Sequence, residues 1–466
     1  MNNEFIKEII DIVGTKNVLI NEQDKLPYKY DGSLFFGENP LLVILPENPD
    51  EISKVVKVCN KYKINIVPRG GGTSLTGSSV PLKNSIVISL LKLNKILEIN
   101  IEDSYVYVES GVRLDSLNSE LEKYNYFFPP DPASSIAATV GGVISTNAGG
   151  LRGAKYGVVK DWVLGIEVIL PNGEKAYFGN KTLKHRIGYD LTSLLIGSEG
   201  TLGIVTKAYL KISPKPEKTI RILSYFENIE KIGQAVVNIK KAGIIPGMAE
   251  MIDKNYLKIL KENTNIEIPC NDCYALIIDV DSTIESVNRH LNIVLEILKN
   301  LNPIFIKYSD DPTEMENLRS VRKGAGSILL MMRKKPTETT ITGDVVVPPS
   351  QLPKFLKEVE IKIKESNKLA PMLGHVGDGN IHADIFTDIS DSEDLKKAIE
   401  LNEQIGLIAL KYGGSVSAEH GIGLEKKDLL IKEYMFRNSI ITLELMKKIK
   451  ETIDPNNILN PEKIFK

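Results

Sequence analysis

Three of the five histidines in this chain lie in its last hundred residues, each near glycines. His375 and His382 bound the segment HVGDGNIH, whose centre Asp378-Gly379 is a two-residue hairpin signal. That turn predicts that His375 pairs with His382 across two strands, with their Cβ atoms about 5 Å apart. An irregular loop would bring the two rings together equally well. Two imidazoles at this spacing can share a divalent metal ion.

The third histidine, His420, follows Glu419 in the segment SAEHGIG. Neighbouring side chains of an extended segment point to opposite sides, so one of the pair can bind a metal ion while the other faces a substrate. Two histidines and one carboxylate suit zinc, manganese or ferrous iron. The alternative is a set of structural histidines whose hydrogen bonds the fold satisfies. The isolated His185 and His290 are expected on the surface.

Three segments rich in glycine and small side chains precede these histidines. They read PRGGGTSLTGSSVP at 68–81, PPDPASSIAATVGGVISTNAGG at 129–150 and GSEGTLG at 197–203. Glycine lets backbone N–H groups approach an anion closely, and long runs of small residues suit backbone that lies flat against a bulky ligand. A Walker A loop is disfavoured because Ser78 stands where its lysine is needed, and a Rossmann loop because no helix follows. A tight surface loop is the alternative for 68–81.

These segments, with STNAGGLRGAKYGVVKDWVLGIEVILPNGE at 145–174, resemble the PCMH-type flavin domain of the vanillyl-alcohol oxidase superfamily. With the histidine segments, nearly the whole chain resembles the branch of D-lactate dehydrogenase, the glycolate oxidase D subunit and D-2-hydroxyglutarate dehydrogenase. The first loop has Arg69 and no histidine, so the resemblance implies noncovalent FAD. The residues that it assigns to FAD are Pro68, Arg69, Gly70, Gly71, Gly72, Thr73 and Ser74, then Gly77, Pro129, Asp131, Thr139, Gly142, Ser145, Asn147, Ala148 and Gly149, and finally Glu199, Gly203, Val205 and Asn460.

The same resemblance assigns the chemistry. It makes His375, His382 and Glu419 the metal ligands and His420 the catalytic base. Arg322, in NLRSVRKGAG, matches the arginine that pairs with the substrate carboxylate, a role that suits the planar guanidinium. A surface arginine on an amphipathic helix is the alternative. Gly326 and Thr342 stand where the D-2-hydroxyglutarate enzymes carry threonine and lysine, which favours a short substrate such as D-lactate or glycolate.

Composition limits the remaining classes of protein. The chain has 466 residues, 42% of them hydrophobic, and a formal net charge of −2, so it is globular and has no basic excess for nucleic acid. No window has the roughly 18 uncharged apolar residues of a membrane span, and the charged N-terminus does not resemble a signal peptide. We therefore expect a cytoplasmic protein. Three cysteines fit a reducing compartment, and the lone CxxC of Cys270 and Cys273 is interpreted as coincidence because one pair cannot complete a zinc site.

The elements that must position these residues indicate an α+β fold. The first half alternates helical and strand patterns, with a helix capped by Asp50 and a hairpin turn at 171–174. The second half alternates long amphipathic helices, at 229–242, 283–300 and 352–366, with strands at 274–280 and 341–347. The polar, proline-bearing stretch 213–218 separates the halves. We predict an N-terminal helical segment (1–36), a two-subdomain FAD-binding domain (37–215), and an α+β substrate or cap domain with a C-terminal helical segment (216–466).

The predicted function is that of an FAD- and metal-dependent dehydrogenase that oxidises a short D-2-hydroxy acid, D-lactate foremost, to the 2-oxo acid. No NAD fingerprint accompanies the flavin motifs, so a partner protein is expected to take the electrons, by resemblance an electron-transfer flavoprotein or an iron–sulfur protein of the same complex. The glycolate oxidase polypeptide of this family is the alternative within it. A non-catalytic flavin-binding component of a larger complex and a metal hydrolase are the alternatives outside it.

Overall fold

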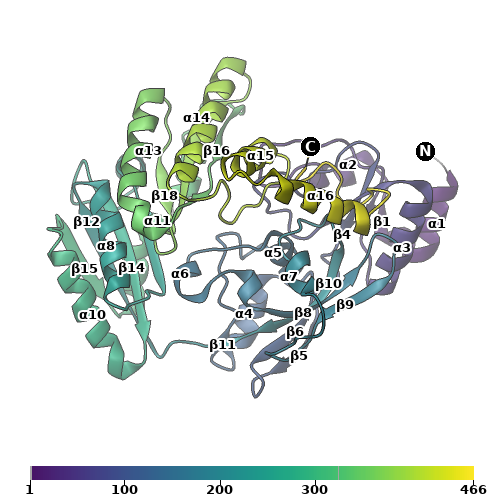
Figure 1. The fold of residues 1–466 in the computed structure, drawn as a ribbon, viewed down its shortest axis with the longest axis horizontal. Coiled ribbons are helices and arrows are strands. Elements are labelled where there is room, and N and C mark those ends of the chain that lie inside the picture. Colours follow the sequence, from purple (N-terminus) through teal and green to yellow (C-terminus); the bar gives the residue numbers. More distant parts are fainter. Residues whose placement is uncertain (1–2, 324, 466) are drawn as a thin grey trace. The chain divides into compact units, whose positions relative to one another are not determined.

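The computed structural model describes residues 3–323 and 325–465, with the side chains of 323 and 325–327 excepted. It confirms the α+β class, and the chain forms two compact units (Figure 1). Unit 1 contains residues 1–149, 158–215 and 419–466, and unit 2 contains residues 150–157 and 216–418. Each unit is described by itself.

The first sheet of unit 1 contains the strand that leads directly into the first glycine-rich segment. Its strand order is β1 (Val18–Leu19), β2 (Val43–Ile44), β4 (Ser85–Ser89) and β3 (Asn65–Arg69), parallel except for the β1–β2 pair. Helices α1 (Asn3–Val13) and α3 (Pro49–Tyr62) cover it with a shared apolar core. The expected cap of α3 was wrong by two residues, because the side chain of Asn48 accepts the N–H of Glu51 at 3.0 Å.

The second sheet of unit 1 is antiparallel and supports the other two glycine-rich segments. Its order is β5 (Ile96–Asn100), β6 (Tyr105–Glu109), β10 (Ile204–Lys211), β8 (Val163–Ile169) and β9 (Lys175–Gly179). The predicted turn at 171–174 joins β8 to β9, and Gly173 provides its positive φ of 80°. Helices α4 (Leu114–Glu122) and α5 (Val140–Thr146) share an apolar core with this sheet.

The C-terminus belongs to unit 1, whereas the sequence assigned all of 216–466 to one later domain. Helices α15 (Lys427–Phe436) and α16 (Ile440–Ile453) lead to an extended segment that runs beside β3. Ile66 donates its N–H to Ile458 O at 2.7 Å and accepts that of Asn460 at 2.8 Å. Composition gave no sign of this pairing because its partners are almost 400 residues apart in the chain.

Unit 2 is a three-layer α/β sandwich around one antiparallel sheet. The strand order is β15 (Phe305–Ser309), β12 (Lys218–Phe226), β14 (Tyr274–Ser282), β13 (Met248–Ile252), β18 (Met372–Gly374), β19 (Asn380–Asp388) and β16 (Glu338–Thr342), with β17 (Val345–Val346) also on β19. One face packs against α8 (Ile229–Lys241), α10 (Ile284–Lys299), α13 (Leu352–Ser366) and α14 (Ser392–Lys411). The other face packs against α9 (Lys254–Asn263), α11 (Pro312–Lys323) and α12 (Ala325–Met331).

The predicted strand 341–347 is interrupted in the structure and forms β16 and β17. Two residues at the interruption belong to the surroundings of the candidate site. Gly343 and Asp344 lie between the two strands, close to β19. A Cβ atom on Gly343 would lie 3.0 Å from the side chain of Asn402, so the chain passes α14 closely here. Among the described helices, none combines the length and apolarity that crossing a bilayer requires.

Candidate active site

A cavity of about 420 Å³ in unit 1 gathers the three glycine-rich segments. It lies where β3 ends, beside α5, and two residues of the C-terminal part of unit 1 complete its wall. The lining comprises residues 68–75, 78, 79, 90, 132–134, 139, 141–143, 145, 146, 148, 149, 199, 200, 419 and 420.

The glycines of the first loop are required by its close approach to the second segment. A Cβ atom on Gly71 would lie 2.1 Å from the backbone oxygen of Ala137, and one on Gly70 would lie 2.2 Å from Thr139 Oγ1. Gly72 has a φ of 68°, a conformation that side-chain-bearing residues rarely adopt. The two segments therefore form a backbone cradle that only glycine permits, which fits a flat, bulky cofactor.

Arg69 turns its side chain into the protein behind this loop. The guanidinium donates to the backbone oxygens of Ser79 at 3.5 Å and Pro27 at 3.3 Å, and lies 5.6 Å from the ring centre of Tyr28. Burial lowers the pKa of Arg69, against the pull of nearby Asp31. Arg69 lines the cavity, and its side chain ties the loop to the backbone of Pro27 and Ser79.

Of the twenty residues that the sequence assigned to the flavin, thirteen line the cavity. These are Pro68, Arg69, Gly70, Gly71, Gly72, Thr73, Ser74, Thr139, Gly142, Ser145, Ala148, Gly149 and Glu199. Seven do not, namely Gly77, Pro129, Asp131, Asn147, Gly203, Val205 and Asn460.

Several of these seven have a structural role instead. Asn147 ends α5 with a φ of 51° and accepts the N–H of Lys160 at 2.9 Å. Val205 lies in β10 within the core, and a Cβ atom on Gly203 would lie 2.4 Å from a methyl group of Val168. Asn460 donates to the backbone oxygens of Ser78 and Glu199, each at 2.8 Å, and so ties two walls of the cavity together.

Glu419 and His420 lie on the wall of this same cavity. A Cβ atom on Gly149 would lie 2.7 Å from Glu419 Oε2, so the carboxylate lies directly on the second glycine-rich segment. The expectation that the two side chains point to opposite sides was wrong, because the segment bends rather than extends. Glu419 Oε1 and His420 Nε2 lie 3.6 Å apart, and both side chains are mostly buried.

A buried carboxylate holds this bent segment in place. Glu199 accepts the backbone N–H groups of Ile422 at 2.7 Å and Gly423 at 2.9 Å. Burial raises the pKa of Glu199 to about 7, although these two hydrogen bonds oppose the shift. Thr76 adds a hydrogen bond from its hydroxyl to His420 O at 3.2 Å. The loop that carries Glu419 and His420 is therefore anchored to the walls of the cavity.

In unit 2 the rings of His375 and His382 lie together, with centres 5.3 Å apart and planes at 80°. The predicted hairpin register was wrong by two residues, because β18 and β19 pair Leu373 with His382. His375 instead lies in a longer turn, and its backbone oxygen accepts the N–H groups of Asp378 and Asn380. The rings converge because the turn bends His375 back, which is the irregular alternative that the sequence had left open.

Each of these imidazoles engages a partner through Nδ1. His375 Nδ1 lies 2.5 Å from Glu250 Oε1, and His382 Nδ1 lies 3.2 Å from Gly343 O. Carboxylate and carbonyl oxygens accept hydrogen bonds, so Nδ1 carries the proton in both rings and a metal ion would take Nε2. Both side chains are buried. The arrangement fits two imidazole ligands with oriented rings.

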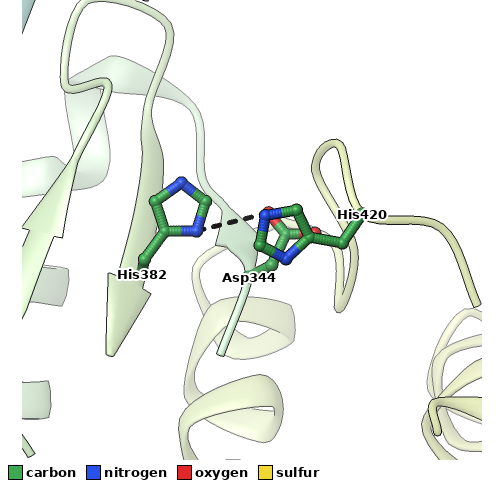
Figure 2. A group of neighbouring side chains, drawn as sticks. All are labelled: Asp344, His382 and His420. Atoms are coloured by element: carbon green, nitrogen blue, oxygen red, sulfur yellow. Dashed lines mark ion pairs between the residues drawn. The ribbon is translucent and has the colours of Figure 1, made fainter. Parts of the chain in front are cut away.

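Asp344 lies beside His382 and was missed by the sequence reasoning. Its Oδ1 lies 3.9 Å from His382 Nδ1 (Figure 2). The same oxygen accepts the side-chain N–H of Asn380 at 3.0 Å. Its Oδ2 accepts the backbone N–H of Ala418 at 3.0 Å. The only sequence signal was an acidic residue after a glycine at a strand end, which is too common to single out.

Arg322 lies on α11 and its guanidinium is directed at a buried carboxylate of β13. Arg322 Nε donates to Glu250 Oε2 at 2.9 Å, and the arginine side chain is only 15% exposed. A surface position for Arg322 is therefore excluded. Thr342 ends β16, and Gly326 belongs to the residues whose side-chain surroundings lie outside the described part.

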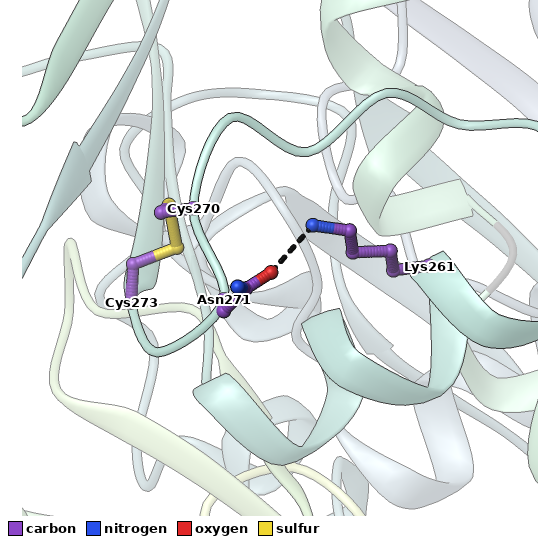
Figure 3. The surroundings of a disulfide bond; sticks show 4 residues. All are labelled: Lys261, Cys270, Asn271 and Cys273. Carbon is purple, nitrogen blue, oxygen red and sulfur yellow. Dashed lines mark hydrogen bonds between the residues drawn. A yellow bond between two sulfur atoms is a disulfide. The ribbon is translucent and has the colours of Figure 1, made fainter.

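The CxxC pair, interpreted from the sequence as coincidence, is a disulfide bond in the structure. Cys270 and Cys273 close a short loop before β14, and Asn271 inside this loop accepts a hydrogen bond from Lys261 of α9 at 2.7 Å (Figure 3). Cys59 is reduced and buried in the core of the first sheet.

Comparison with known families matches both parts of the chain. The family model described as "FAD linked oxidases, C-terminal domain" matches residues 215–464, and the one described as "FAD binding domain" matches residues 40–176. The glycolate oxidase subunit GlcD of Bacillus subtilis is 36% identical over 98% of this chain and 96% of its own. A D-lactate dehydrogenase of Anaerostipes hadrus is 33% identical over 99% of this chain and 97% of its own.

Solved structures agree on the fold. A 4-ethylphenol oxidase from Gulosibacter chungangensis superposes with a TM-score of 0.80 at 18% identity, over 99% of this chain and 96% of its own. A p-cresol methylhydroxylase superposes with a TM-score of 0.78 at 20% identity, with the same coverage. At these identities the likeness concerns the fold alone.

Proposed function

The chain belongs to the family of FAD-linked oxidases, and from that premise we propose that it oxidises a short D-2-hydroxy acid, D-lactate foremost, to the corresponding 2-oxo acid. The observation that carries this proposal is the presence of Glu419 and His420 on the wall of the glycine-lined cavity. A candidate base and the cavity that fits a flavin are thereby one site. A cavity with neither side chain would have favoured a non-catalytic flavin-binding protein.

His420 is the proposed base. Its ring lies on the cavity wall, where it can take the proton of a substrate 2-hydroxyl group as the C2 hydrogen leaves with its electron pair. FAD, when bound in the cavity, supplies the acceptor for that hydride. We propose noncovalent FAD because the first loop offers no histidine for a tether, and acid precipitation should release the yellow cofactor from the protein.

We propose His375, His382 and Glu419 as ligands of a divalent metal ion. The Nδ1 contacts of both rings fit this role, because an imidazole ligand is usually oriented by a hydrogen bond at its other nitrogen. Such an ion would lower the pKa of the substrate hydroxyl. Arg322 would bind the substrate carboxylate through its forked guanidinium. The electrons would leave through a partner protein, an electron-transfer flavoprotein or an iron–sulfur protein.

Glycolate is the second candidate substrate, favoured by the 36% identity to a protein named glycolate oxidase subunit GlcD. Glycolate lacks the methyl group of lactate and has no stereocentre at C2. An anaerobic visible spectrum separates the two candidates, since bleaching of the flavin band by D-lactate but not L-lactate supports the first, and bleaching by glycolate alone supports the second. A colourless protein that takes up no added FAD would contradict both.

The matched test of the base is His420→Ala against His185→Ala. We expect His420→Ala to bleach at least about 100-fold more slowly than wild type, because general bases typically contribute that much or more. His185 is exposed and its replacement should change nothing. Both variants should retain FAD. A rate for His420→Ala within about threefold of wild type would remove His420 from the mechanism.

A further inference from the structure

Glu250 is a fully buried carboxylate in the middle of a core strand. It is the central residue of β13, and its side chain is 0% exposed. Its neighbours on the same face, Met248 and Ile252, belong to the apolar core under α9, α11 and α12. Burying a carboxylate is costly unless it is paired and hydrogen-bonded, so its position requires specific partners.

The two oxygens of Glu250 reach two different candidate functional residues. Oε1 lies 2.5 Å from His375 Nδ1, and Oε2 accepts the N–H of Arg322 Nε at 2.9 Å. The sheet brings the two residues of the first contact close together, because the β13–β18 register pairs Met251 with Gly374, the neighbours of Glu250 and His375 in the chain. The second contact uses Nε, and a guanidinium carries two further Nη groups that can bind a carboxylate.

We propose that Glu250 is a positioning residue that serves two sites at once, orienting His375 as a metal ligand and Arg322 as the substrate-carboxylate receptor. This inference rests on the proposed function and adds a residue to which neither the sequence motifs nor the resemblance assigned a role. One carboxylate fixes the proton on Nδ1 of His375, so that Nε2 faces the metal ion. The same carboxylate fixes the direction of the guanidinium. Metal affinity and substrate affinity should therefore both depend on Glu250.

Two substitutions separate charge from reach. Glu250→Gln keeps the shape and removes the charge. Glu250→Asp keeps the charge but is shorter by one methylene group, so it cannot hold both partners at their present distances. Asp279→Asn is the matched control, because Asp279 on the neighbouring strand β14 also forms a mostly buried pair with an arginine, Arg221, through both of its oxygens.

The first measurement is the affinity of the FAD-loaded protein for Zn²⁺ in competition with a chromophoric chelator and without substrate. We expect both Glu250 variants to bind Zn²⁺ 10- to 100-fold more weakly than wild type, as is typical when the hydrogen-bond partner of a metal ligand is removed. Asp279→Asn should stay within twofold of wild type. Weaker Zn²⁺ binding by Glu250→Asp would show that the length of the side chain matters, because this variant keeps the negative charge.

The second measurement is the KM for D-lactate, or for glycolate if that is the substrate, at saturating Zn²⁺. We expect KM to rise at least tenfold in both Glu250 variants and to stay unchanged in Asp279→Asn. A change in Zn²⁺ affinity without a change in KM, or the reverse, would overturn the shared role. Glu250 variants that match wild type in both quantities would overturn it as well. Loss of the fold in both variants, with Asp279→Asn folded, would assign Glu250 a purely structural role and also overturn it.

Wild-type protein distinguishes failure of this inference from failure of the proposed function. If wild type bleaches with substrate and binds Zn²⁺ while the Glu250 variants behave identically, only the role of Glu250 fails. If wild type neither bleaches with a 2-hydroxy acid nor binds Zn²⁺, the proposed function fails and the role of Glu250 with it.

Discussion

Replacement of Lys450 by methionine should release the C-terminal segment, whose Asn460 ties two walls of the cavity together. Lys450 lies on α16 and its ammonium group is buried. It donates to the backbone oxygens of Thr201 and Leu459, each at 2.8 Å, and to Asp454 Oδ2 at 2.5 Å. Burial lowers the pKa of Lys450, and Asp454 opposes that shift. Methionine retains the length and apolar stem but offers no donor.

The size of the loss follows from the burial of both partners. The side chain of Lys450 is 11% exposed and that of Asp454 is 0% exposed, so the substitution leaves a carboxylate in the interior without its cationic partner. Breaking a buried ion pair from one side costs about 3–5 kcal/mol. Asp454 also accepts the N–H groups of Ile458 and Leu459, and the next residue, Asn460, ties together two walls of the cavity. FAD retention should therefore fall together with stability.

Urea unfolding followed by tryptophan fluorescence provides the assay. The chain has a single tryptophan, Trp162, and it packs against the core of unit 1, so its emission reports on that unit. The control is Lys123→Met, since Lys123 forms an exposed pair with Glu120 on the surface of α4. Exposed pairs contribute little, so this control should unfold like wild type. A loss below about 1 kcal/mol for Lys450→Met, or full retention of FAD, would refute the reasoning.

Three further predictions concern the cavity and the disulfide bond. Gly71→Ala should lower FAD affinity at least tenfold in an apoprotein titration, because the new Cβ would lie 2.1 Å from Ala137 O and backbone must move. The pKa of Glu199 is about 7 in the folded state and near 4.5 in the unfolded state, so between these pH values the folded state binds one proton more. The unfolding free energy of wild type, measured in urea titrations, should therefore fall by about 3 kcal/mol between pH 4.5 and 7.5, relative to that of Glu199→Gln. Replacing Cys270 and Cys273 by serine should leave the rate of flavin bleaching unchanged, since their loop contacts α9 through Lys261, outside the candidate site.

The parts of the molecule that could be predicted from the sequence are those that local chemistry dictates. The turn at 171–174 and the helix 352–366 follow from short-range patterns, and the structure contains both. The first loop was recognisable because three consecutive glycines indicate that other groups approach its backbone closely. In the structure Gly70 and Gly71 lie directly against the second glycine-rich segment.

The errors share a different physical origin. The hairpin register at 375–382 failed because the turn is longer than its Asp-Gly centre indicates, so tertiary packing overrode the local signal. The assignment of Gly203 and Val205 to the cofactor stays a prediction, and the structure places both residues outside the lining of the cavity. Cys270 and Cys273 were set aside because a spacing says nothing of oxidation state.

Sequence reasoning could not identify the partners of two buried carboxylates, of which it assigned Glu199 to the flavin and gave Glu250 no role. Glu199 fixes the loop behind His420 through two backbone N–H groups, and Glu250 engages His375 and Arg322 through one oxygen each. The partners of each come from elements far away in the chain. Because a buried carboxylate is costly without hydrogen bonds, the fold must supply partners for both acids. For Glu199 these are backbone N–H groups of the segment that follows His420, and for Glu250 they are His375 and Arg322 themselves. Both carboxylates therefore help to position candidate functional residues, Glu199 through the backbone and Glu250 through direct contact with their side chains.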